Sequence, residues 1–133
     1  KELSKRAFSD INGQKILNGI IWPELYLVIE KKMISSEHKY NIFIVDAALL
    51  FEANLQNLFD DVLLITANEN IRINRASNRL KIGKQFVIQR MNLQMPESQK
   101  IKLTKYIIYN NETITHLNKE LENFYKKIVL PHL

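Results

Sequence analysis

The sequence predicts an α/β fold in which helices cover a parallel sheet. Three apolar runs of strand length support this prediction: residues 41–46 (NIFIVD), 61–66 (DVLLIT) and 106–109 (YIIY). Because their apolar residues are continuous rather than alternating, these runs are typical of strands buried on both faces, as in parallel sheets. Parallel strands need long crossover connections, and segments with helical spacing lie between the runs. We therefore expect an open, doubly wound sheet.

Length and composition limit the class of protein further. The 133 residues, of which 46% are hydrophobic and 25% charged, suffice for one domain or most of one. The absence of cysteine excludes disulfides and thiolate metal sites, and it is consistent with a reducing compartment. No apolar run reaches the length of a membrane span. The net charge of +5 favours acidic partners such as phosphates or nucleic acid.

The first third of the chain is predicted to be helical. Leucine and isoleucine recur at three- and four-residue spacings over residues 1–39. Pro23, which follows Trp22, predicts a break and then a new helix, because proline suits a first helical turn. The first predicted strand, 41–46, comes next, and a short apolar stretch ending at Glu52 follows it.

The second strand, 61–66, leads into another predicted helix. Asn68 is its expected N-cap, Glu69 lies at its positive end, and the helix is expected to run to about Leu80. Residues 81–105 are polar, basic and helical, with interruptions at glycine and proline. After the third strand, Asn110 and its neighbour predict a turn. The final helix carries an apolar stripe made of Ile114, Leu117, Leu121, Phe124 and Ile128.

Charge is distributed unevenly along the chain. The 27 residues from Asn70 to Pro96 contain no acid and six basic side chains: Arg72, Arg75, Arg79, Lys81, Lys84 and Arg90. The first three of these share one helical face, beside an apolar stripe made of Ile73, Ala76 and Leu80. We expect a ligand to supply the missing counter-charge, since the arginine fork suits phosphate oxygens. A polyphosphate site, a solvated basic face and a nucleic-acid surface remain alternatives, although aromatic residues do not alternate with the basic ones as in a stacking platform.

Asp46 is the second candidate site residue. It ends an apolar run, as does the Walker B acid that helps to hold Mg²⁺ beside nucleotide phosphates. The alternative is a strand-end aspartate that caps the following turn. Glu52, six residues later, is expected at the same edge or simply at the surface.

Several blocks of the sequence, in their order and spacing, resemble the central and C-terminal parts of dephospho-CoA kinases, a family of P-loop kinases. The family's D-x-P-L-L-F-E block appears as residues 46–52, and its R-x-x-x-R pair as Arg75 and Arg79. Its R-x-x-x-Q lid signature appears as Arg90 and Gln94, and its late asparagine as Asn110. The helical start, with LSKRAF and ILNGIIWP, resembles the family's acceptor-binding region.

The chain also departs from the family pattern. Ala48 replaces a proline, Trp22 a histidine, Arg72 a common glutamine and Glu112 a glycine, while Thr104 and Lys105 replace Ala-Asp. The three glycines cannot form a Walker A motif, and the chain begins at Lys1 rather than Met. By resemblance, the strand and phosphate loop of the family would precede Lys1, so we expect a fragment that is inactive alone.

The resemblance implies a P-loop kinase-type fold and an activity. The activity is transfer of the γ-phosphoryl group of ATP to the ribose 3′-hydroxyl of dephospho-CoA, with Mg²⁺, in the cytoplasm. By resemblance, Arg79, Arg90 and Asp46 would be catalytic, with Asp46 binding magnesium through water. Arg75, Arg79 and Arg90 would be lid arginines that bind the phosphates, Arg75, Arg79 and Asn110 would bind ATP, and Phe51 and Glu52 would bind the acceptor. Residues 1–40 would bind the acceptor, 41–80 and 105–133 would form the sheet core, and 81–104, with a mobile part at 81–95, would form the lid.

Other functions remain possible from the sequence alone. Another P-loop kinase, acting on nucleosides or nucleotides, would carry the same arginines. A basic nucleic-acid-binding module would bind with an affinity that falls steeply with salt. A third alternative is a non-catalytic partner protein.

Overall fold

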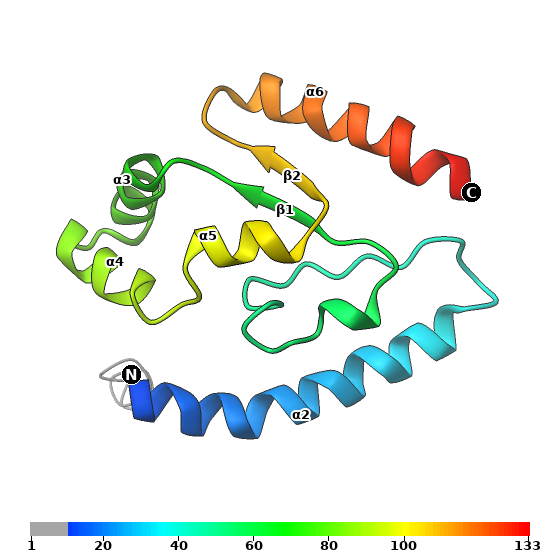
Figure 1. Cartoon of the computed structure of the whole chain (residues 1–133), viewed down its shortest axis with the longest axis horizontal. Helices are drawn as coiled ribbons and strands as arrows, with labels where there is room; N and C mark the ends of the chain where they lie inside the picture. The colour runs from blue at the N-terminus through cyan, green and yellow to red at the C-terminus, as the bar shows by residue number, and fades with distance from the viewer. Residues whose placement is uncertain (1–10) are drawn as a thin grey trace. The chain divides into compact units, whose positions relative to one another are not determined.

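The structure is a computed structural model and describes residues 11–133. The chain divides into two compact units, residues 1–57 and 58–133. The beginning of the predicted helical region, residues 1–10, lies outside the described residues. Figure 1 shows the helices and strands along the chain.

The first unit is built on one long helix, α2 (Ile11–Ser36), which continues through Pro23. The break expected at Pro23 is therefore wrong. Proline lacks the N–H that would bond to the carbonyl group of Gly19, so the helix loses one hydrogen bond there. The ring is exposed, and the rest of the 26-residue helix continues on both sides of it.

Residues 41–46 correct a second expectation, because they form no strand among the described residues. A continuous apolar run becomes a strand only where neighbouring strands take up its backbone hydrogen bonds. None does so here, and the Ile44 side chain is 82% exposed. The following turns are compact: the N–H of Ala53 donates to the carbonyl of Leu49 at 3.0 Å, and Phe51 is buried.

The second unit contains a parallel pair of strands, which confirms the predicted parallel α/β class. Strand β1 (Leu63–Thr66) pairs with β2 (Tyr106–Tyr109), with Leu63 opposite Tyr106. The Asn110 N–H extends the ladder by donating to the Thr66 carbonyl at 2.6 Å. At the other end, the Thr104 hydroxyl donates to the Val62 carbonyl. Both ends of the strand pair are thus fastened.

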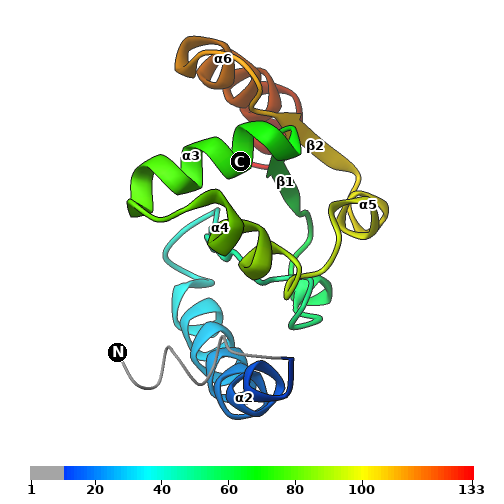
Figure 2. The ribbon, with the colours of Figure 1, turned by 90° about the vertical axis from the view of Figure 1, so that its left-hand side faces the viewer.

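The crossover between the two strands is helical. It runs through α3 (Glu69–Leu80), α4 (Lys84–Met91), α5 (Glu97–Lys100) and the 3₁₀ turn η2 (Ile101–Leu103). Figure 2 shows α3 leaving the carboxyl end of β1 and the chain turning back into α4. The two helices pack together, and each buries an apolar residue, Ile73 and Val87. Residues 84–91, inside the predicted lid, therefore form a helix.

The chain closes with a helix against the sheet. Helix α6 (Ile114–Phe124) begins at Thr113, whose hydroxyl accepts a hydrogen bond from the His116 N–H at 3.2 Å. The rings of Phe124 and Tyr106 meet edge to face, with centroids 5.3 Å apart. The π-helical turn η3 (Tyr125–Val129) and the 3₁₀ turn η4 (Leu130–His132) follow, and a 3₁₀ turn η1 (Gln56–Leu58) precedes β1. Within residues 11–133, no helix is long and apolar enough to cross a membrane.

Candidate functional site

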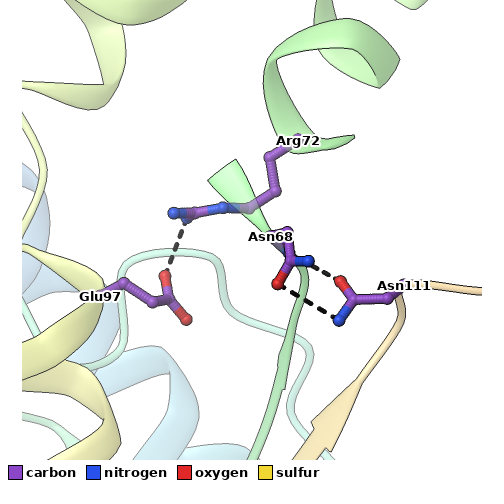
Figure 3. Close-up of polar contacts among 4 residues, drawn as sticks. All are labelled: Asn68, Arg72, Glu97 and Asn111. Carbon is purple, nitrogen blue, oxygen red and sulfur yellow. Dashed lines mark hydrogen bonds and ion pairs between the residues drawn. The ribbon is translucent and has the colours of Figure 1, made fainter. Parts of the chain in front are cut away.

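The candidate site is centred on α3, which begins just after the carboxyl end of β1. Asn68 occupies the N-cap position as expected, but its side chain makes no capping hydrogen bond, so that part of the prediction is wrong. Its amide oxygen instead accepts from Asn111 Nδ2 at 3.3 Å, while its backbone N–H donates to Asn111 Oδ1 at 2.7 Å. Figure 3 shows the two amides facing each other. This pair ties the start of α3 to the loop that follows β2.

Arg75 makes a second connection to the same loop. Its Nη1 donates to the Asn110 carbonyl at 2.7 Å, and its Nη2 lies 3.4 Å from the Glu112 carbonyl. Two of the predicted site residues, Arg75 and Asn110, are therefore brought into direct contact. Charged donors make stronger hydrogen bonds than neutral ones, so Arg75 holds the backbone of the loop firmly.

Arg72 corrects the expectation that the arginines lack a protein counter-charge. Its Nη1 lies 2.8 Å from Glu97 Oε2, and both side chains are partly buried, with exposed fractions of 34% and 23%. Glu97 is the first acid after the acid-free stretch and the first residue of α5. Arg72 is therefore paired within the protein, and a ligand is not needed to neutralise it.

Arg79 has different surroundings from the other two arginines of α3. It lies in the last turn of the helix and is exposed, and its side chain makes no hydrogen bond or ion pair with any residue in 11–133. Arg90 is exposed on α4, near that helix's carboxyl end. Because the Arg79 side chain has no such partner, all five of its guanidinium donors are available for phosphate oxygens.

The other predicted site residues belong to the first unit. Asp46 is exposed at the end of the irregular segment 41–46. Phe51 is only 5% exposed and belongs to the core of its unit, while Glu52 beside it is half-buried. No group of three or more histidine, cysteine or acidic residues that could hold a metal occurs in the described part of the chain. The roles proposed for these three residues from the sequence stay predictions.

Two residues of the site have no signal in the sequence. Glu97 is 25 residues from Arg72, and Asn111 is 43 residues from Asn68. The sequence indicates only an acid after Pro96 and an asparagine in a turn. No periodicity connects them with α3, because these contacts exist only once the crossover has folded back beside the sheet.

The protein is an α/β protein in which an arginine-bearing helix follows the carboxyl end of a parallel strand. Open α/β sheets bind their ligands at this edge of the sheet. A comparison with known families identifies the group. The family model described as dephospho-CoA kinase matches residues 1–116, and the chain belongs to this family.

Individual relatives agree with that membership. The chain is 30% identical over 127 residues to a dephospho-CoA kinase of Chlamydia felis, with 94% of this chain and 63% of the relative covered. It is 29% identical over 129 residues to one of Lactobacillus johnsonii, with 96% and 65% covered. The chain thus spans less than two thirds of the length of these relatives.

A solved structure has the same fold. The crystal structure of TT1252 from Thermus thermophilus superposes with a TM-score of 0.74 at 23% sequence identity, over 96% of this chain and 66% of that one. The similarity supports the α/β architecture described above.

Proposed function

We propose that the protein transfers the γ-phosphoryl group of ATP to the ribose 3′-hydroxyl of dephospho-CoA, which yields coenzyme A. The observation that carries the proposal is the dephospho-CoA kinase family match over residues 1–116. The arginines of α3 support it, because phosphoryl transfer depends chiefly on positioning and on neutralising negative charge.

In this proposal Arg75, Arg79 and Arg90 have different roles. Arg79, exposed and without a protein partner among the described residues, binds the phosphates of ATP and stabilises charge that develops in the transition state. Arg90 acts with it from α4. Arg75 fixes the loop at Asn110, and this loop forms the nucleotide side of the site.

Mg²⁺ would accompany ATP in this reaction, and the chain offers a residue suited to it. Mg²⁺ keeps several waters and is usually bound through one or two carboxylates together with substrate phosphates. Asp46 fits that pattern, since its carboxylate is exposed and can accept hydrogen bonds from waters on the ion. When bound, Mg²⁺ would neutralise charge on the phosphates.

The acceptor would meet the first unit. Glu52 and Phe51 follow Asp46 in the compact turns of residues 48–54, so they are the proposed acceptor-binding residues. The burial of Phe51 suggests that its ring mainly holds the turn in place, while Glu52 is the more accessible of the two. The proposed location is the cytoplasm, where ATP is available.

The test uses the full-length natural protein with ATP, Mg²⁺ and a panel of acceptors. Dephospho-CoA should be phosphorylated at the 3′-hydroxyl with release of one ADP per product, and AMP and nucleosides should react much more slowly. The Arg79→Ala protein, purified in the same way, controls for contaminating kinases. Preferred phosphorylation of AMP or a nucleoside would instead assign another kinase activity to the protein.

A further inference from the structure

The Arg72–Glu97 ion pair connects two segments that lie at the ends of the basic stretch. Arg72 is the fourth residue of α3, and Glu97 is the first residue of α5. Between them run the rest of α3, with Arg79, and all of α4, with Arg90. We name this ion pair the clasp.

The clasp is shielded from water more than an ordinary surface ion pair. Its side chains are 34% and 23% exposed, whereas those of the Lys126–Glu122 pair on α6 are 64% and 62% exposed. Partial shielding strengthens the attraction between the charges, and it also makes the loss of one partner more costly than at an exposed pair, because the other charge stays partly buried. Removing one partner of the clasp should therefore cost more stability than removing one partner of the exposed pair.

The clasp contains one hydrogen bond between its two side chains. Arg72 Nη1 donates to Glu97 Oε2 at 2.8 Å, while Arg72 Nε and Glu97 Oε1 are buried without a hydrogen-bond partner among the described residues. Only one of the five guanidinium donors is thus used on Glu97. A lysine at position 72 supplies a charge and a donor as well, so it should preserve most of the interaction.

The neighbours of the clasp hold α3 from another side. Asn68 ties α3 to the loop after β2, and Arg72 ties it to α5 (Figure 3). Arg75 makes a further contact with the same loop. Helix α4 packs on α3 inside the stretch that the clasp closes. Removing the clasp would take away the ion pair that joins α3 to α5, while the packing of α4 on α3 would remain.

We propose that Arg72 and Glu97 are positioning residues for the phosphate-binding arginines. By joining the ends of residues 73–96, the clasp keeps Arg90 on α4 at a set place relative to Arg79 on α3, so that both arginines meet one nucleoside triphosphate. The identity of that ligand rests on the proposed function. The role of the clasp in holding the two arginines in place does not depend on which ligand they bind.

The experiment compares Arg72→Gln, Glu97→Gln, the double variant and Arg72→Lys in the full-length protein. Each glutamine variant should raise the KM for ATP about tenfold, the equivalent of about 1.4 kcal/mol. The kcat should fall far less than in Arg79→Ala, because both arginines are still present. The double variant should be no worse than either single one, because all three lose the same contact. Arg72→Lys should stay within about twofold of the natural protein.

Amide hydrogen exchange supplies a measurement that needs no substrate. Peptides from α4 and the start of α5 should exchange faster in both glutamine variants, while peptides from α6 should not change. Lys126→Gln is the matched control, since it breaks an exposed ion pair on α6 and should alter neither the KM nor exchange in α4.

The possible failures are distinguishable. If dephospho-CoA is not phosphorylated, the proposed function fails, and the exchange of α4 still decides whether the clasp exists in solution. Additive effects in the double variant, an unchanged KM with unchanged exchange, or faster exchange spread evenly over the chain would each overturn the positioning role.

Discussion

Arg75 and Arg79 lie four residues apart on α3 but have different surroundings. Arg75 donates to two backbone carbonyls of the loop after β2, whereas Arg79 contacts no partner among residues 11–133. The same R-x-x-x-R spacing therefore supports two different roles. Arg75 is suited to shaping the site, and Arg79 to contacting the phosphates.

Arg79→Ala should lower kcat by on the order of 10³, because arginine contributes directly to neutralising the transition state. Steady-state kinetics of the full-length protein would measure the effect. An unchanged kcat would contradict the phosphate-binding role of Arg79.

Arg75→Gln should mainly affect nucleotide binding. Loss of its hydrogen bonds to the loop should raise the KM for ATP about tenfold, the equivalent of about 1.4 kcal/mol. This is less than two charged hydrogen bonds could contribute, because both are exposed to water and one is long, at 3.4 Å. The kcat should change only a few-fold, in contrast to Arg79→Ala. A fall in kcat as large as that for Arg79→Ala, with the KM unchanged, would show that Arg75 contacts the reacting phosphate instead.

Glu122 offers a test of local electrostatics away from the site. The hydrogen bond and charge of Lys126, at 2.6 Å, hold the pKa of this exposed carboxyl below its usual value of 4.5. A lowered folded pKa means that the stabilisation is fully present above pH 4.5 and is lost as the pH falls through the folded pKa. Lys126→Gln should therefore raise the pKa of Glu122 toward 4.5 in an NMR titration of its carboxyl carbon, and an unchanged pKa would contradict the pairing in solution.

Among the elements, the helices of the second unit are defined by local signals. Helix α3 begins at Glu69 and ends at Leu80, as its apolar stripe and first-turn acid predict. Its end is marked by Lys81 in the left-handed conformation, with φ of 54°, which turns the chain toward α4. Helix α6 begins after a threonine that caps it through its hydroxyl.

Thr113→Ala should destabilise the protein by about 1 kcal/mol, the usual value for loss of an N-cap hydroxyl. The hydroxyl accepts from the His116 N–H, and alanine leaves that donor to water. Urea unfolding would measure the change, and Thr115→Ala, in the exposed first turn of α6, is a suitable control. Equal effects of the two substitutions would argue against the cap.

At the scale of the whole molecule, the second unit depends on its buried residues around the parallel strands. Ile108 of β2 is 6% exposed, while Ile114 at the start of α6 is 69% exposed. The same change in side chain can therefore be compared in two environments.

Ile108→Ala should destabilise the protein by about 2 to 5 kcal/mol through lost burial and a residual cavity. Ile114→Ala should change stability by no more than about 0.5 kcal/mol, as is usual for exposed positions. Denaturant unfolding of both variants would measure the difference, and similar values would mean that β2 is not buried in solution.

The sequence alone predicted much of the second unit, since β2, the helix at 69–80 and the parallel pairing follow from local patterns. It was wrong about residues 41–46 and about Pro23. In the first case, an apolar run cannot indicate whether a neighbouring strand is present to pair with it. In the second case, a proline indicates only the loss of one hydrogen bond. It does not indicate that the many other hydrogen bonds of a long helix can outweigh this loss.

Residue identity and short-range spacing by themselves determined the α/β class, the acid-free basic stretch and the family resemblance. Only the tertiary structure decided which arginine pairs with an acid, which one holds the loop and which one has no side-chain partner among the described residues. The reason is physical: the partners of Arg72 and Arg75 lie 25 and 35 residues away along the chain. A guanidinium can meet them only after the crossover has brought α5 and the end of β2 beside α3.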